Sequence, residues 1–252
     1  MPMTFQPLFL KSESVFQFWR QFVKETFRGR FEWREILRQC FAVGNTSFFL
    51  VSFTAFLAGI VFTTQSRPSL SSFGAESWLP SLVAQAVVRS LGPLITGLIC
   101  AGKLGSNIGA ELASMKVTEQ IDAMDVSGSR PFSYLVVSRV IATTLMLPIL
   151  VIYADSIALF GSYLTIHSMN NTGFTSYVNA IGASITYIDI FSSLIKGIFI
   201  GFSIGFVSTY AGFNSENGTT GVGKAANIAV VVSMLSIFIV DLLMLQFLKL
   251  IR

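Results

Sequence analysis

The sequence contains little charge, little cysteine and a single histidine. Charged residues make up 12% of the 252 residues, about half the share found in soluble domains, whereas hydrophobic residues make up 52%. Two cysteines (Cys40, Cys100) and His167 are too few for a disulfide framework or a zinc cluster. We therefore expect no metal and no redox chemistry, and a fold that places its apolar surface in a membrane.

The basic residues are concentrated near the N-terminus. The net charge is +4, but the basic residues do not form one soluble patch, so we expect no nucleic-acid partner. The apolar stretch up to Leu10 is short and lacks a basic lead, so we expect no secretory signal. An anionic membrane surface is the better partner for the first 42 residues. Seven basic residues lie there: Lys11, Arg20, Lys24, Arg28, Arg30, Arg34 and Arg38.

Aromatic and basic residues alternate at helical spacing over residues 15–41. This pattern predicts an amphipathic helix lying in the membrane interface, in two pieces that meet near Gly29. A solvated soluble helix is the alternative. Residues 1–42 form a first region in this interpretation, followed by the membrane domain at 43–252.

Five apolar blocks reach the length of about 20 residues that a helix needs to cross a bilayer. They predict an all-α integral membrane protein with five transmembrane helices. Within the third block, Pro148 is the expected position of a kink. The predicted spans are 43–65, 80–101, 132–165, 188–211 and 225–248.

The loop charges predict the orientation, because loops rich in Lys and Arg stay cytoplasmic. The N-terminal segment and residues 102–131 hold ten basic residues, and Lys224 lies in the 212–224 loop on the same side. The other side has Arg67, no basic residue between 166 and 186, and Lys249 with Arg252. We expect a cytoplasmic N-terminus and a periplasmic C-terminus.

Two glycine patterns carry structural predictions. Gly197, Gly201 and Gly205 repeat every fourth residue, which allows another helix to approach closely. Residues 218–224 read GTTGVGK, which is close to a phosphate-binding loop. However, Ala225 stands where such a loop needs Ser or Thr, so we predict a short turn before the fifth span.

Charged residues inside apolar spans are costly, and are candidates for function. Arg89 is the strongest candidate because it lies near the middle of the second span; a structural ion pair is the alternative. For the other charged residues, pairing between helices or a position at the membrane boundary is the preferred interpretation. These residues are Arg139, Asp155, Asp189, Lys196 and Asp241.

Residues 102–131 form a semi-polar segment between the second and third spans, with acidic and basic residues at helical spacing. Gly128 and Pro131 close it. Such a helix is what a transport subunit needs to transmit the motion of a soluble ATPase.

In this segment the sequence resembles the MlaE-type permease family, the membrane subunits of ABC transporters that work with Mce-type lipid-binding proteins. The resemblance covers about residues 43–250, and TEQIDA is its most specific block. It departs from the family pattern at Ser90, where Glu is common, and at Lys103, where Arg is usual. The matching stretches are LGP at 91–93, AGKLG at 101–105, AELASM at 110–115, KVTEQIDAM at 116–124, SRPFSYLVVSRVIA, MLPIL, and GVGKAAN before the last span.

The resemblance implies a permease subunit of the bacterial inner membrane. It implies a second copy of the chain, two cytoplasmic ABC ATPase subunits that bind the ATP, a periplasmic ring of Mce-type protein, and phospholipid as the cargo. The implied lipid-binding positions are Phe62, Leu70, Phe73, Arg89 and Leu91. The implied ATPase-coupling positions are Lys116, Glu119, Gln120, Asp122 and Met124.

Two other functions remain open at this point. A membrane-embedded enzyme of lipid metabolism needs a nucleophile, an acid–base pair or a metal cluster, for which one histidine and scattered carboxylates are poor material. A self-contained secondary transporter typically contains inverted repeats, and none is evident.

Overall fold

The computed structural model describes residues 12–27, 32–170 and 172–251, and these residues form helices and no strand. Five helical stretches are long and apolar enough to cross a membrane, which confirms the predicted all-α membrane fold. The elements are α1 (Ser12–Phe27), α2 (Trp33–Ser72), η1 (Glu76–Trp78), α3 (Leu79–Ala86), η2 (Val87–Leu91), α4 (Gly92–Cys100), η3 (Ala101–Gly105), α5 (Ser106–Val117), α6 (Gln120–Val126), η4 (Phe132–Val137), α7 (Ser138–Asn170), α8 (Phe174–Ser184), α9 (Tyr187–Phe213) and α10 (Thr219–Ile251).

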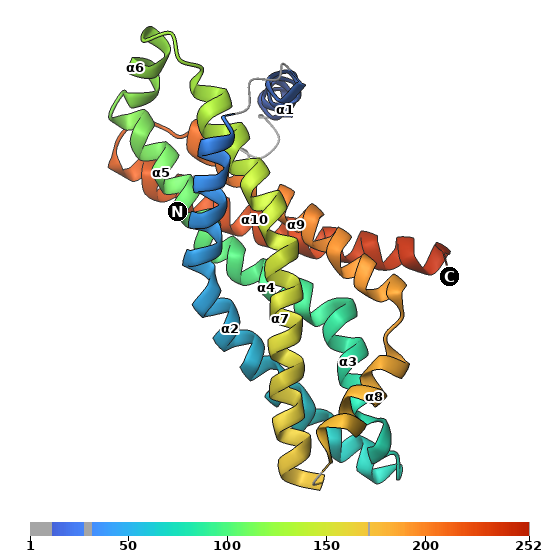
Figure 1. Cartoon of the computed structure of the whole chain (residues 1–252). Coiled ribbons are helices and arrows are strands. Elements are labelled where there is room, and N and C mark those ends of the chain that lie inside the picture. The colour runs from blue at the N-terminus through green and yellow to red at the C-terminus, as the bar shows by residue number, and fades with distance from the viewer. Residues whose placement is uncertain (1–11, 28–31, 171, 252) are drawn as a thin grey trace, which may run out of the picture.

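The helices alternate in direction between two ends of the molecule (Figure 1). One end carries α1, α6 and the beginnings of α2 and α7, and we call it the α6 end. The opposite end carries the last turns of α2 and α7 together with α3 and α8, and we call it the α8 end. Helices α9 and α10 lie side by side and run obliquely across this arrangement.

The amphipathic helix predicted near the N-terminus is present as α1. Phe18 and Phe22 are buried, and the Phe18 ring lies 5.0 Å from the ring of Phe132 and 5.5 Å from that of Phe206. On the other face, Phe16 is exposed. These contacts attach α1 to η4 and α9. Lys11, Arg28, Gly29 and Arg30 lie outside the described residues.

Helix α2 differs from the prediction. The segment from residue 33 to 41, predicted as the second interfacial piece, is the beginning of α2, so residue 42 lies inside a helix. Neither Gly nor Pro occurs between Trp33 and Phe41 to end a helix there. Its 40 residues extend over about 60 Å, twice the thickness of a hydrocarbon core, so the helix projects beyond the membrane.

The second span also continues further than predicted. Two π-helical segments, η2 and η3, link α3, α4 and α5 into one helical path from residue 79 to 117. Glu119 then adopts a left-handed backbone conformation (φ 57°), and the short helix α6 follows. The single amphipathic helix expected within residues 102–131 is therefore divided, because a residue with positive φ cannot continue an α-helix.

The glycine repeat of the fourth span packs as predicted. A Cβ atom on Gly197 would lie 2.8 Å from Pro148 Cα, and one on Gly201 would lie 2.5 Å from the Thr143 carbonyl oxygen. A Cβ atom on Gly205 would likewise lie too close to the Thr143 side chain. The glycines therefore allow α9 to lie directly against α7. Helix α7 contains Pro148 and is not broken there.

Helix α8 was not predicted, because its residues were interpreted as part of a loop. It packs against α3, where Ser81 donates a hydrogen bond to the Ala180 carbonyl oxygen (3.2 Å). Tyr177 is its buried anchor and donates to the Leu159 carbonyl oxygen of α7 (2.9 Å). Burial raises the pKa of the Tyr177 phenol above its ordinary value, which keeps this donor protonated.

The GTTGVGK stretch is a turn only at its first residue. Gly218 has a positive φ (98°), and the next six residues form the first turns of α10. Lys224 pairs with Glu216 at 2.9 Å on the exposed surface. The predicted turn is therefore shorter than expected and the helix begins earlier.

Candidate functional site

Arg89 lies in η2, where the helix widens to a π-helical turn. Such turns interrupt the regular pattern of backbone hydrogen bonds and are frequent at functional sites. The side chain of Arg89 is 33% exposed although the residue lies in the middle of a spanning segment. The unusual backbone and the unusual charge thus coincide at one residue.

Asp189 of α9 holds the Arg89 side chain by two hydrogen bonds. Arg89 Nε donates to Asp189 Oδ1 (2.9 Å), and Arg89 Nη2 donates to Asp189 Oδ2 (3.1 Å). Asp189 is only 6% exposed, and its Oδ2 also accepts from the Thr186 backbone amide (3.0 Å), which caps the beginning of α9. The guanidinium therefore has a protein counter-ion of fixed position.

Lys196 and Asp241 form a second ion pair beside the first. Lys196 is fully buried, and its Nζ donates to Asp241 Oδ1 of α10 (2.6 Å) and to the Arg89 carbonyl oxygen (2.7 Å). Ser90 donates a long hydrogen bond to Asp241 Oδ2 (3.4 Å). The pairing between helices that was the preferred interpretation of Asp189, Lys196 and Asp241 is confirmed. Ser90 stands where glutamate is common in the family pattern, and its hydrogen bond to Asp241 adds no charge.

Asp155 of α7 is the remaining buried acid of this region. Its Oδ2 accepts a hydrogen bond from Ser193 (3.3 Å), whereas its Oδ1 has no hydrogen-bond partner. A Cβ atom on Gly92 would lie only 1.6 Å from Oδ1, so glycine is required for the acid to fit. Asp155 thus packs against the helix that carries Arg89, without contacting Arg89 itself.

A cavity of ≈ 470 Å³, open to the surface of the chain, lies beside Arg89 between the end of α2 and the helices η1 and α3. Most of its wall is apolar, and Arg89 is the only charged residue among those that line it in the described part of the chain. The lining residues are Leu70, Ala75, Trp78, Ser81, Leu82, Gln85, Ala86 and Arg89. An apolar wall with a few polar groups is typical of small-molecule sites.

Two of the five lipid-binding positions that the resemblance implies, Leu70 and Arg89, share this cavity. Leu91 lines a separate void of only ≈ 10 Å³ between α2, α4 and α7. Phe62 is partly buried against the main core, and Phe73 is 86% exposed at the end of α2. The single chain therefore brings two of the five together.

The predicted coupling residues lie at the α6 end. Glu119, Gln120 and Asp122 are exposed, Met124 is half-buried against the core, and Lys116 donates to the Ser215 carbonyl oxygen after α9 (2.8 Å). Lys116 thus attaches α5 to the end of α9, while the three polar residues after it face outward. Of the five predicted positions, Glu119, Gln120 and Asp122 are thus the exposed ones.

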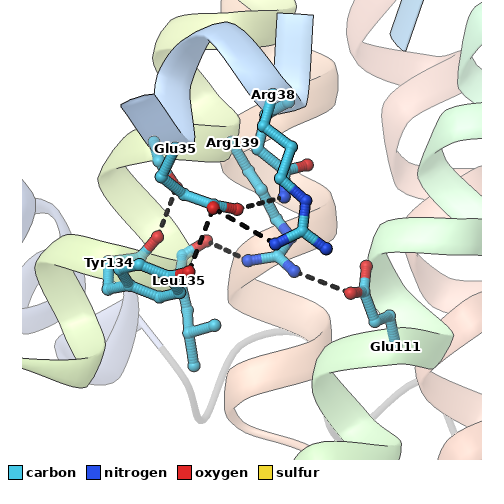
Figure 2. Close-up of polar contacts among 8 residues, drawn as sticks. Glu35, Arg38, Glu111, Tyr134, Leu135 and Arg139 are labelled. Atoms are coloured by element: carbon cyan, nitrogen blue, oxygen red, sulfur yellow. Dashed lines mark hydrogen bonds and ion pairs between the residues drawn. The ribbon is translucent and has the colours of Figure 1, made fainter. Parts of the chain in front are cut away.

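A polar cluster joins α2, α5, η4 and α7 near the same end (Figure 2). Tyr134 donates to Glu35 Oε2 (3.0 Å), and Arg38 lies 3.5 Å from the same oxygen. Arg139, which is 3% exposed, donates to the Leu135 carbonyl oxygen (2.9 Å) and to Glu111 Oε1 (2.9 Å). Pairing between helices, the preferred interpretation of Arg139, is confirmed.

Sequence reasoning missed Asp189 as the partner of Arg89, and it missed Gln85 in the cavity wall. The capping-box spacing of Thr186 and Asp189 was a signal for the beginning of α9, but it does not reveal a partner 100 residues away. Gln85 precedes Arg89 by four residues, a spacing that places two side chains on one helix face.

Comparisons with known proteins agree with this architecture. The family model described as Permease MlaE matches residues 36–247. A probable ABC transporter permease protein of Rickettsia typhi is 39% identical over 213 residues, which cover 84% of this chain and 82% of that protein. A probable ABC transporter permease protein of Synechocystis is 34% identical over 212 residues, or 84% of this chain and 81% of that protein.

A more distant relative comes from a plant. The Arabidopsis thaliana protein named TRIGALACTOSYLDIACYLGLYCEROL 1, chloroplastic, is 31% identical over 227 residues, which cover 90% of this chain and 65% of that protein. The family match extends over five spanning segments and both charged pairs beside the cavity. This chain therefore belongs to the MlaE family of ABC transporter permeases.

Proposed function

We propose that this chain is the permease subunit of an ABC transporter that moves phospholipid between the bacterial inner membrane and a periplasmic Mce-type carrier. The observation that carries the proposal is Arg89, a partly exposed guanidinium in a membrane-spanning segment and on the wall of a mostly apolar cavity. A guanidinium suits a phosphate headgroup, and the apolar wall suits acyl chains. The name of the Arabidopsis relative contains a galactolipid, which supports a lipid cargo in general.

The proposed assembly contains two copies of this chain, two ATPase subunits at the α6 end and an Mce-type ring at the α8 end. The exposed carboxylates of Glu119 and Asp122 suit a soluble ATPase. The distribution of Lys and Arg supports a cytoplasmic α6 end and a periplasmic C-terminus. ATP binds to the partner subunits in this proposal, and the chain itself carries no cofactor.

The central experiment measures phospholipid bound to the purified protein by mass spectrometry. We expect Arg89→Ala to lower bound phospholipid about tenfold, because a charge-assisted contact to phosphate is lost. Arg89→Lys should bind more phospholipid than Arg89→Ala but less than the wild type, since an ammonium cannot form the bidentate contact. Lys224→Ala, which removes a basic residue from an exposed ion pair, is the matched control.

Size-exclusion chromatography of the same variants separates binding from assembly. Unchanged lipid content in Arg89→Ala contradicts the headgroup role, and a collapsed dimer assigns Arg89 to structural pairing with Asp189. Cysteine labelling at the two termini tests the orientation. Labelling of the N-terminus from outside intact cells contradicts it.

A further inference from the structure

The wall of the cavity beside Arg89 has no net charge once the counter-ion of Arg89 is included. Among the residues that the structure describes, Arg89 is the only charged one lining it, and Asp189 neutralises Arg89 at 2.9 Å. If a net anion bound here, its charge would add to a balanced pair beside a mostly apolar wall, which is unfavourable. A ligand that carries both a positive and a negative group adds no net charge.

Arg89 retains donors for a negative group. A guanidinium has five N–H donors, and only Nε and Nη2 donate to Asp189. The remaining N–H groups belong to a side chain that is one-third exposed on the cavity wall. A phosphate can therefore bind Arg89 while Asp189 stays in place.

Gln85 supplies an acceptor on the same wall. Its Nε2 donates a long hydrogen bond to the Ser184 carbonyl oxygen at the end of α8 (3.5 Å), which leaves Oε1 for a ligand. Gln85 lies four residues before Arg89, and both side chains line the same cavity. An ammonium can contact Gln85 while its phosphate contacts Arg89.

We infer that Gln85 and the Arg89–Asp189 pair form a site for a zwitterionic phospholipid headgroup, with the phosphate at Arg89 and the ammonium at Gln85. This inference rests on the proposed function and specifies its cargo. Gln85 then selects for the ammonium, and Asp189 selects against net anionic headgroups. Ser81, one turn before Gln85, is occupied by its bond to α8.

The test uses the transporter purified into nanodiscs that contain phosphatidylethanolamine, phosphatidylglycerol and N-acetylated phosphatidylethanolamine with identical acyl chains. The N-acetylated lipid keeps the phosphate and loses the ammonium. We expect the wild type to retain phosphatidylethanolamine over each of the other two by about tenfold, the ratio expected for one charge-assisted hydrogen bond. This comparison needs no variant to fold.

Two variants assign the selectivity. Gln85→Leu is expected to remove most of the preference for phosphatidylethanolamine, because the phosphate contact that remains at Arg89 is common to the three lipids. Asp189→Asn keeps a side-chain oxygen for the cap of α9 but leaves the positive charge of Arg89 without a counter-ion. We therefore expect this variant to retain more phosphatidylglycerol than the wild type does. The matched controls are Gln65→Leu on the exposed surface of α2 and Glu216→Gln in an exposed ion pair.

Equal retention of the three lipids by the wild type overturns the inference, as does a Gln85→Leu variant that keeps the full preference. In either case the proposed function stands if Arg89→Ala still lowers total bound lipid. Absence of any retained phospholipid in the wild type overturns both.

Discussion

The ammonium group of Lys196 donates a hydrogen bond to the main-chain carbonyl oxygen of Arg89 at 2.7 Å. Asp189, two helical turns earlier in α9, binds the side chain of the same arginine. One face of α9 therefore fixes both the backbone and the guanidinium of Arg89. In a membrane a buried carbonyl without a partner is costly, so Lys196 also stabilises the π-helical turn that carries Arg89.

We expect the loss of one member of the Lys196–Asp241 ion pair to destabilise the protein more than the loss of both. Lys196→Met leaves Asp241 buried without its cation and should lower the free energy of unfolding by about 3–5 kcal/mol. Adding Asp241→Leu should recover a large part of this loss, because no lone charge remains. Thermal unfolding of the detergent-solubilised variants measures the loss in the single variant and the recovery in the double variant. Lys224→Met in the exposed pair is the control. A Lys196→Met variant that is as stable as the wild type contradicts the prediction.

Gly201 is expected to be irreplaceable at the contact between α7 and α9. Gly201→Ala places a Cβ atom 2.5 Å from the Thr143 backbone oxygen, so the helices must separate, at a cost of about 1–3 kcal/mol. The matched control is Gly223→Ala in α10, where nothing lies within 4 Å and alanine should be neutral or favourable by about 0.5–1 kcal/mol. Equal unfolding temperatures for the two variants refute this role.

The exposed acids at the beginning of α6 are expected to contact the ATPase. Glu119→Lys or Asp122→Lys should reduce lipid-stimulated ATP hydrolysis at least about tenfold, because a reversed charge costs several kcal/mol at a complementary interface. Glu119→Gly removes the charge but suits the positive φ, which separates the charge effect from the backbone effect. Glu216→Lys is a control on another exposed acid. Full hydrolysis and retained ATPase in both reversals exclude α6 as the coupling element.

Glu111 is expected to stabilise the buried Arg139. Because the Glu111 side chain is 55% exposed, solvent screens part of the pair, and we expect Glu111→Gln to cost about 1–3 kcal/mol. The Arg139 guanidinium keeps its bond to the Leu135 carbonyl oxygen, so the fold should survive (Figure 2). Glu216→Gln, in a pair that is exposed on both sides, should change the unfolding temperature by less than Glu111→Gln does. Equal effects would mean that burial of Arg139 is immaterial.

The sequence by itself determined the membrane class, the five spans and the family. Apolar block length reports directly on bilayer thickness, and the KVTEQIDAM block is specific enough to identify the family. The glycine repeat at 197, 201 and 205 indicated close helix packing for a local reason, since it depends only on the absence of side chains along one face.

Helix ends were decided by features that hydropathy does not report. Residues 33–41 are basic and aromatic, as in an interfacial helix, yet they form the beginning of α2 because neither Gly nor Pro interrupts the helix there. Helix α8 contains no charge and is too short to span, so its pattern resembles a loop; its docking on α3 and its buried Tyr177 create it.

Only the tertiary structure decided the partner of Arg89. The sequence shows an arginine in an apolar span and several acids elsewhere, but ion pairing depends on which helix faces meet, and those faces are separated by 100 residues in the chain. Helix packing brings Asp189 and Lys196 to one arginine, and so converts an apparently isolated cation into a neutral, bidentate pair on a cavity wall. Charge balance in a medium of low dielectric is a property of the assembled bundle, and no segment of the sequence contains it.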